Sequence, residues 1–172
     1  QCSTCHAGQF QTDHDFHAIA LPQVGPGKSA RFETHARDEG RLRVTGNPAD
    51  SYKFRTPSLR NIAQTAPYGH NGAYATLEAM IRHHLDPVAS LKAYNVAQLV
   101  LPDLPNSRDF RATYDPDEQA AIAAANELSP SNLSETEIIQ IVAFLNALSD
   151  TASLAGKLGV PQTVPSGLPV DQ

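Results

Sequence analysis

Helical periodicity is clearest between residues 75 and 85. The apolar face of the expected helix carries Leu77, Met80, Ile81, His84 and Leu85, which follow the i, i+3, i+4, i+7, i+8 spacing. Thr76 is a suitable N-cap, and Asp86-Pro87 closes the helix. The pattern places His84 on the buried face and turns His83 about one residue step away from it. A histidine at a buried position needs partners for its ring nitrogens.

Two more helices are predicted from their first residues. Ser134-Glu135-Thr136-Glu137 is a capping box that opens a helix ending near Ser149. One face of this helix carries Ile138, Ile141, Val142, Leu145 and Leu148. Asp115-Pro116 supplies an N-cap and a proline at the first helical position, which predicts an Ala-rich helix to about Leu128. The pattern also permits a short helix over residues 88–100.

The rest of the chain shows little periodicity. Residues 10–50 contain turn signals, such as Leu21-Pro22 and Thr45-Gly46-Asn47-Pro48, and no sustained apolar repeat. After Gly156 the chain is rich in proline, and we expect residues 151–172 to form an extended C-terminal tail. The predicted fold is therefore all-α, with helices joined by long ordered loops in one domain, residues 1–150.

Composition narrows the possible functions. The chain has 172 residues, 41% of them hydrophobic, and a formal net charge of −5. One domain of this size can bury a sizeable core, although its apolar fraction is slightly low. No basic cluster suggests binding to nucleic acid, and no apolar run approaches the length of a membrane span.

The first residues carry the strongest chemical signal. Cys2-Ser3-Thr4-Cys5-His6 has the spacing of a covalent attachment site for c-type haem. On a helical turn, residues three and four apart lie on one face, so both thiols can bond the haem vinyl groups while His6 binds the iron. The sequence has only two cysteines, so it predicts one covalent haem. Such a haem supplies part of the apolar core.

The two cysteines permit two other interpretations. A redox dithiol of the thioredoxin type is expected after a strand. A zinc site needs four ligands, and the best set here is Cys2, Cys5, His14 and His17. The gap between Cys5 and His14 is too short for the hairpin of a zinc finger. The haem interpretation uses the full motif and is preferred.

Periodicity alone does not decide which residue is the second iron ligand. Met80 is the only methionine and lies on the apolar face of the expected helix, although a helical methionine is more often a core residue. His84 lies on the same face. The pattern favours these two residues equally, ahead of His83 and His70, and a haem without a second ligand is the remaining alternative.

Two arginines, and then a turn, precede the expected helix at residues 75–85. Arg55 and Arg60 lie in Phe54-Arg55-Thr56-Pro57-Ser58-Leu59-Arg60-Asn61, and a guanidinium group can pair with a haem propionate. The simpler interpretation is that both are surface cations. The turn Thr65-Ala66-Pro67-Tyr68-Gly69-His70-Asn71-Gly72 comes next.

Together these features resemble the C-terminal, electron-transferring domain of the bacterial di-haem cytochrome c peroxidase and MauG family. The resemblance rests on the haem motif, the two stretches just quoted and the closing helix at 138–148, and it covers most of the chain. It implies a cytochrome c-like domain in which His6 and a residue of the helix after the turn bind the iron. That position falls on His84, where the family's peroxidases carry methionine and MauG-like members tyrosine.

Further expectations come from the resemblance alone. It implies that His70, Arg55 and Arg60 shape the haem pocket, and that calcium binds backbone carbonyls of Thr65 and Pro67. It implies a periplasmic, exported protein that exchanges electrons with a small redox protein, with a homodimer as one possible assembly. The family's peroxide-reacting haem lies in an N-terminal domain, and no second haem motif or tryptophan occurs in these residues.

Two functions are therefore carried forward. In the first, the chain relays electrons to a peroxidatic haem in a missing N-terminal domain of a di-haem enzyme. In the second, it is a free-standing mono-haem electron carrier without enzymatic activity. The start of the chain one residue before the haem motif predicts the first, a piece of a longer protein.

Overall fold

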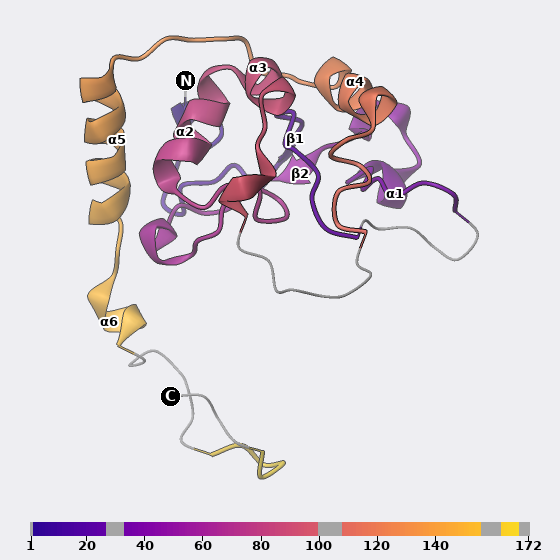
Figure 1. Ribbon diagram of the computed structural model, residues 1–172. Helices are drawn as coiled ribbons and strands as arrows, with labels where there is room; N and C mark the ends of the chain where they lie inside the picture. Colours follow the sequence, from indigo (N-terminus) through magenta and orange to yellow (C-terminus); the bar gives the residue numbers. More distant parts are fainter. Residues whose placement is uncertain (1, 27–32, 100–107, 156–162, 169–172) are drawn as a thin grey trace.

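Short helices and long ordered connections make up the computed structural model, which describes residues 2–26, 33–99, 108–155 and 163–168 (Figure 1). The α-helices are α1 (Leu42–Thr45), α2 (Leu77–Leu85), α3 (Pro87–Lys92), α4 (Pro116–Ala124), α5 (Glu135–Ala147) and α6 (Thr151–Leu154). Four 3₁₀ turns accompany them: η1 (Cys2–Thr4), η2 (Pro48–Asp50), η3 (Ile62–Gln64) and η4 (Val96–Gln98). The prediction of a mostly helical domain with long loops is confirmed.

A two-stranded sheet is the only β-structure with named strands in the described part of the chain. Strand β1 (Phe16–His17) pairs antiparallel with β2 (Phe54–Arg55), so that Phe16 lies opposite Arg55 and His17 opposite Phe54. The Thr12 hydroxyl donates to the Thr56 carbonyl at 2.7 Å beside this sheet. These bonds fix the N-terminal segment against residues 54–56.

Helix α2 has the boundaries that its sequence predicts. The Thr76 side chain accepts a hydrogen bond from the Ala79 N–H at 3.1 Å, and Asp86 both ends α2 and caps α3. The predicted orientation of the two histidines is wrong. His83 is fully buried, whereas His84 is half-buried, because His83 points toward the segment that contains Ile19 and bonds to its carbonyl.

Helix α5 also begins where predicted and packs against α2 and η3. The Ser134 hydroxyl accepts from the Glu137 N–H at 3.3 Å, while the Glu137 carboxylate accepts from the Ser134 N–H at 2.7 Å. Ile138 and Leu145 are buried on the predicted apolar face. An ion pair between Arg82 of α2 and Glu135 of α5 joins the two helices at the surface.

Three predicted stretches differ from the structure. Helix α4 ends at Ala124, before Leu128, because the Glu127 N–H donates to the Ala18 carbonyl at 2.9 Å. The helix permitted over 88–100 is α3 followed by the separate turn η4, whose N-cap is Asn95. The tail predicted to be extended begins with helix α6, because the Asp150 carboxylate caps its first turn. Pro161 and Pro169 lie outside the described residues.

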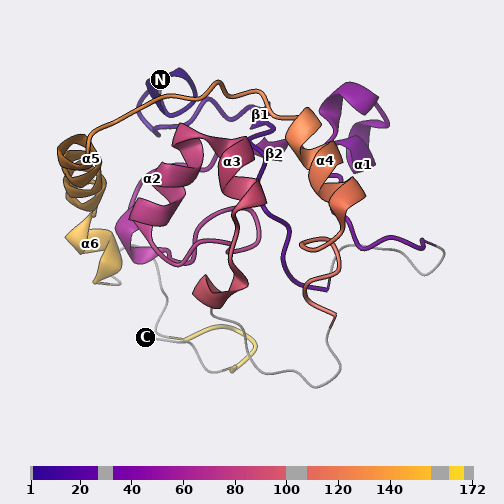
Figure 2. The same ribbon diagram turned by 45° about the horizontal axis from the view of Figure 1, so that its top comes forward.

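Two small clusters of buried residues form the core. One contains Val24, Tyr68, Ala73 and Tyr74, and the other contains Ala20, Leu91 and Ile122. In both ribbon views the N-terminal turn lies beside α2, and α3 lies next to α4 (Figures 1 and 2). None of the helices in the described ranges is long and apolar enough to cross a membrane.

Candidate haem-binding site

The motif cysteines lie on the turn that opens the chain. The Cys5 and His6 N–H groups both donate to the Cys2 carbonyl, at 3.3 and 2.9 Å. This bonding closes one helical turn, as the motif requires. Cys2 is exposed, Cys5 is half-buried, and neither forms a disulfide. Both thiols are therefore available for bonding to a haem.

His6 is oriented by a backbone carbonyl. Its Nδ1 lies 3.2 Å from the Gln11 carbonyl oxygen. A carbonyl only accepts, so Nδ1 carries the proton and Nε2 carries the lone pair. An imidazole held in this way is prepared to bind a metal through Nε2, and the carbonyl raises its basicity.

His84 has the same arrangement on α2. Its Nδ1 lies 2.8 Å from the Met80 carbonyl oxygen, so this ring also carries its lone pair on Nε2. Burial lowers the pKa of His84, the Met80 carbonyl opposes that shift, and the charge of His6 lowers it further. His6 and His84 therefore share the same arrangement, with Nδ1 held by a backbone carbonyl and Nε2 left to bind a metal.

The neighbouring candidates are engaged elsewhere. His83 uses both ring nitrogens, Nδ1 with the Tyr74 hydroxyl at 2.8 Å and Nε2 with the Ile19 carbonyl at 2.7 Å. Burial lowers the pKa of His83 to about 4, so the ring is neutral near pH 7. Met80 packs against the cluster of Val24, Tyr68, Ala73 and Tyr74. These contacts favour structural roles for both residues.

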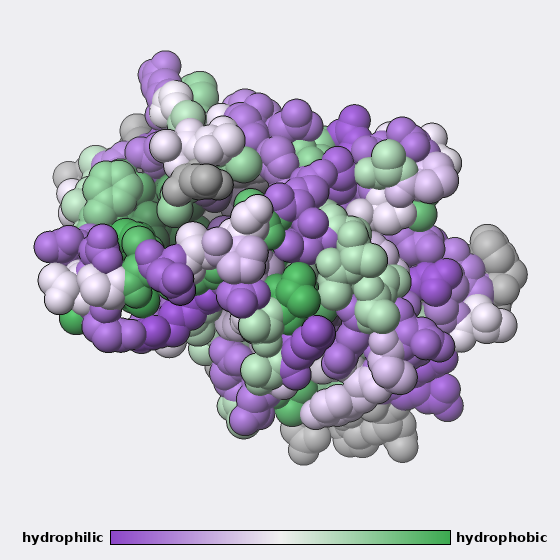
Figure 3. All heavy atoms as spheres, turned by 90° about the horizontal axis from the view of Figure 1, so that it is seen from above, coloured by the Kyte–Doolittle hydropathy of each residue, from purple (hydrophilic) through white to green (hydrophobic). Residues whose placement is uncertain are grey.

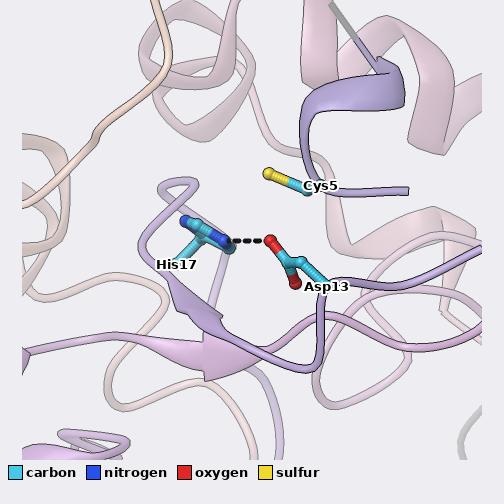
Figure 4. A group of neighbouring side chains, drawn as sticks. All are labelled: Cys5, Asp13 and His17. Carbon is cyan, nitrogen blue, oxygen red and sulfur yellow. Dashed lines mark hydrogen bonds and ion pairs between the residues drawn. The ribbon is translucent and has the colours of Figure 1, made fainter. Parts of the chain in front are cut away.

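Figure 4 shows the surroundings of Cys5. The Cys5 sulfur, an Asp13 oxygen and a His17 nitrogen lie within 4.8 Å of one another, and His17 Nε2 lies 2.8 Å from Asp13. Burial raises the pKa of the Cys5 thiol, and the Asp13 charge raises it further. Burial opposes the shift of Asp13, yet hydrogen bonds from the Asp15 backbone and His17 lower its pKa to about 2.

The surroundings of Cys5 argue against the zinc and dithiol interpretations of the two cysteines. The thiolate is the form that binds zinc or exchanges disulfides, and a raised pKa disfavours it. Of the four ligands weighed for zinc, the cluster contains Cys5 and His17, with Asp13 in addition. His14 faces Arg55, whose guanidinium lies 3.4 Å from its Nδ1. The local charges therefore favour a neutral thiol at Cys5.

The remaining predicted pocket residues lie on the surface. Arg60 pairs with Asp150 at 2.7 Å, and Arg55 is exposed beside His14. His70 bonds to Asp38 at 2.9 Å and stacks on Phe54 with ring centroids 3.7 Å apart. Thr65 and Pro67 are exposed on either side of Ala66, and the calcium site expected at their backbone carbonyls stays a prediction.

Sequence reasoning missed three contributors to this region. The Gln11 carbonyl, which orients His6, belongs to a residue with a φ of 52°, and a backbone carbonyl leaves no motif. The Tyr74 hydroxyl, which bonds to His83, depends on a tertiary contact. The contact of Asp13 could have been inferred from the sequence, because Asp13 stands four residues before His17.

Several large apolar side chains are exposed at the surface. Ile139 and Phe144 of α5 are 67% and 58% exposed, and Phe10 of the N-terminal segment is 58% exposed. In Figure 3, hydrophobic atoms collect at the left of the view, where α5 lies. A haem ring needs apolar cover, and exposed apolar side chains of this kind are available to supply it.

The chain is similar in sequence to cytochrome-c peroxidases and MauG proteins. It is 30% identical to cytochrome-c peroxidase IdrP1 of Denitromonas iodatirespirans over 172 residues, 89% of this chain and 38% of that protein. It is 30% identical to the methylamine utilization protein MauG of Paracoccus denitrificans over 162 residues, 87% of this chain and 39% of that protein. The chain is a relative of the cytochrome-c peroxidases and MauG proteins.

The fold agrees with this relationship. A solved MauG-like protein associated with microbial copper homeostasis matches 88% of this chain and 43% of its own, with a TM-score of 0.56 and 28% identity. No known family profile matches the chain. The chain thus spans about two fifths of the length of these relatives of the peroxidase and MauG type.

Proposed function

We propose that this chain is the c-type haem electron-transfer domain of a di-haem peroxidase or MauG-like oxidoreductase. One observation carries the proposal. His6 of the motif turn and His84 of α2 each have Nδ1 bonded to a backbone carbonyl, which leaves Nε2 for a metal. The similarity to peroxidases and MauG proteins supports the same role.

Each residue of the site has a distinct task. Cys2 and Cys5 anchor the ring through thioethers, while His6 and His84 bind iron through Nε2. The Gln11 and Met80 carbonyls fix the orientation of these two imidazoles. Bound haem supplies reversible one-electron chemistry. Two imidazole ligands give a lower reduction potential than a histidine–methionine pair.

The motif turn lies at the surface. Cys2 is exposed, so a small redox protein would approach a haem held by this turn from that side. Phe10 of the N-terminal segment and Phe144 of α5 are exposed apolar side chains that such a protein could contact. In a di-haem enzyme, this domain would hold the haem that supplies electrons to the peroxidatic haem of the partner domain.

Intact mass and haem counting on the natural protein test the proposal. Two haems on a polypeptide much larger than this chain, with peroxide consumption that requires an electron donor, are the expected result. A mass equal to this chain plus one haem, without peroxidase activity, indicates the free-standing carrier. A protein without covalent haem contradicts both functions.

A further inference from the structure

The loop that follows the Cys2–His6 turn has a single buried anchor. Among residues 2–17, all of which the structure describes, Thr12 is the only buried residue, with 8% of its surface exposed. The other residues of this segment are exposed or half-buried, so burial of side chains contributes little to holding the loop. Its position therefore depends on hydrogen bonds, and several of these meet at Thr12.

Three hydrogen bonds of Thr12 join separate parts of the chain. Its hydroxyl donates to the Thr56 carbonyl at 2.7 Å and accepts from the His14 N–H at 3.0 Å. Its backbone N–H donates to the carbonyl of Ala7, the first residue after the motif, at 2.9 Å. Thr12 thus connects the motif turn to the residue that follows strand β2.

The residue before Thr12 has an unfavourable backbone conformation. Gln11 has a φ of 52°, in the left-handed region that residues with a Cβ rarely adopt. Such a conformation persists only where the surrounding structure holds it. The Gln11 N–H is bonded to the Gly8 carbonyl at 3.1 Å on one side, and Thr12 is anchored on the other. The hydroxyl of Thr12 is therefore part of what keeps Gln11 in this conformation.

One planar peptide unit links Thr12 to His6. The Gln11 carbonyl and the Thr12 N–H belong to this unit, so they cannot turn independently. The N–H bonds to Ala7, and the carbonyl accepts from His6 Nδ1 at 3.2 Å. Without the bond from the Thr12 hydroxyl to Thr56, the unit can rotate, and relief of the strain at Gln11 favours that rotation. Rotation of the unit turns the carbonyl away from His6.

We propose that Thr12 is a positioning residue for the imidazole of His6 and acts through the peptide unit that it shares with Gln11. The proposal rests on the proposed function, in which His6 binds iron through Nε2. An acceptor on Nδ1 fixes the plane of the ring and makes Nε2 a stronger electron donor. The hydroxyl at position 12 therefore sets both the orientation and the basicity of this ligand.

The same contact gives Thr56 a task in the stretch of residues 54–61. Thr56 is 6% exposed, and its N–H donates to the Asp15 carbonyl at 2.9 Å while its own carbonyl accepts from Thr12. Residues 12 and 15 are thereby held to one residue beside the sheet. The stretch thus supports the motif through backbone groups, in addition to the pairing of β1 with β2.

The test compares Thr12→Val with Thr12→Ser in the full-length holoprotein. Valine keeps the branched shape of threonine without the hydroxyl, whereas serine keeps the hydroxyl. Thr12→Val is expected to raise the reduction potential of the haem bound at the motif, because a less basic imidazole stabilises oxidised iron less. Exchange of the His6 Nδ1 proton is expected to become about five- to tenfold faster, the factor that corresponds to one lost hydrogen bond. Thr12→Ser is expected to restore both values.

The matched control is Thr113→Val. Thr113 is also buried, with 6% of its surface exposed, and its hydroxyl likewise donates to a backbone carbonyl, that of Gln23. This variant is expected to lose stability to a similar extent but to leave the potential and the exchange of the His6 proton unchanged. Equal shifts in Thr12→Val and Thr113→Val, or an unchanged potential in Thr12→Val, overturn the positioning role while the covalent haem still supports the proposed function.

A measurement on the wild-type holoprotein covers a Thr12→Val variant that does not fold. In hydrogen exchange followed by nuclear magnetic resonance, the His6 Nδ1 proton is expected to be protected to the same degree as the His14 N–H. The two protons share this protection because the bonds at Gln11 and Thr12 open together. A His6 proton with far lower protection moves independently of the loop and overturns the proposal alone. A natural protein without covalent haem overturns the proposed function as well.

Discussion

Single residues decide the chemistry of this site, and its histidines show how. His6 and His84 each give one nitrogen to a backbone carbonyl and keep the other. His83, directly beside His84, gives both of its nitrogens to protein groups. Adjacent residues of one helix thus have opposite capacities to bind a metal. Burial alone does not identify a ligand, because the fully buried histidine is the one without a lone pair to spare.

The assignment of His84 predicts a spectroscopic change in one variant. In the haem-loaded protein, His84→Ala is expected to convert the low-spin iron spectrum to a high-spin one, because the second nitrogen ligand is lost. Absorption and electron paramagnetic resonance spectra measure this change. The control is Met80→Leu, which keeps the carbonyl that bonds to His84 and is expected to leave the iron low-spin. The opposite pattern would identify Met80 as the ligand.

At the scale of elements, the first turns of α2 and α5 are stabilised by capping side chains that can be recognised in the sequence. The Ser134 hydroxyl and the Glu137 carboxylate close the first turn of α5 reciprocally. Ser134→Ala is expected to cost about 1 kcal/mol of unfolding free energy, because one N–H group loses its acceptor. Chemical denaturation measures the loss.

The matched control for this cap is Ser131→Ala. Ser131 is exposed, and its only described bond uses the backbone N–H, which alanine retains. Its effect is expected to stay within about 0.5 kcal/mol, as for most surface substitutions. An equal loss in the two variants would show that the Ser134 hydroxyl does not stabilise α5.

The ion pair between α2 and α5 is expected to contribute less to the free energy of unfolding than the Ser134 cap does. Arg82 is 43% exposed and Glu135 is 72% exposed at their side chains. Glu135→Gln is therefore expected to lower the unfolding free energy only slightly, because solvent screens an exposed pair. Denaturation at low and high salt tests this, and the difference from wild type should shrink as salt is added. A difference that is independent of salt would mean that α5 depends on another contact of Glu135.

The same elements show what a sequence can predict. Thr76 and Ser134 act within their own helices, so the starts of α2 and α5 were predictable from local residues. The end of α4 depends on a bond between Glu127 and Ala18, and the burial of His83 depends on Ile19. Both partners are distant in sequence, and no periodicity records them. The motif at Cys2–His6 could be recognised in the sequence, because its chemistry requires a fixed spacing between the two cysteines and the histidine.

At the scale of the whole molecule, tyrosines connect different segments around a small core. The chain has 5 tyrosines. Four of them are buried or half-buried with hydrogen-bonded hydroxyls: Tyr52, Tyr68, Tyr74 and Tyr94. These bonds reach Glu118, Ile62, His83 and Ala73, so they connect segments that the helices do not join. The fold therefore depends on phenols that keep their protons.

This dependence predicts unfolding at alkaline pH. Burial raises the pKa of each of these four tyrosines, to about 12 for Tyr74. The phenols ionise near pH 10 in the unfolded chain, so the unfolded state releases protons first and becomes favoured as pH rises further. Stability should be constant with respect to these groups below about pH 9 and fall above pH 10, by up to about 1.4 kcal/mol per pH unit for each tyrosine.

Thermal unfolding followed from neutral to alkaline pH, together with tyrosinate absorbance, measures this effect. Tyrosinate from the buried phenols is expected to appear together with the loss of helical circular dichroism. Tyr52→Phe removes one ionising phenol and its bond to Glu118, so the variant should start less stable but lose stability less steeply above pH 10. Ionisation of the buried tyrosines while the helices stay intact would show that these hydroxyls do not hold the segments together.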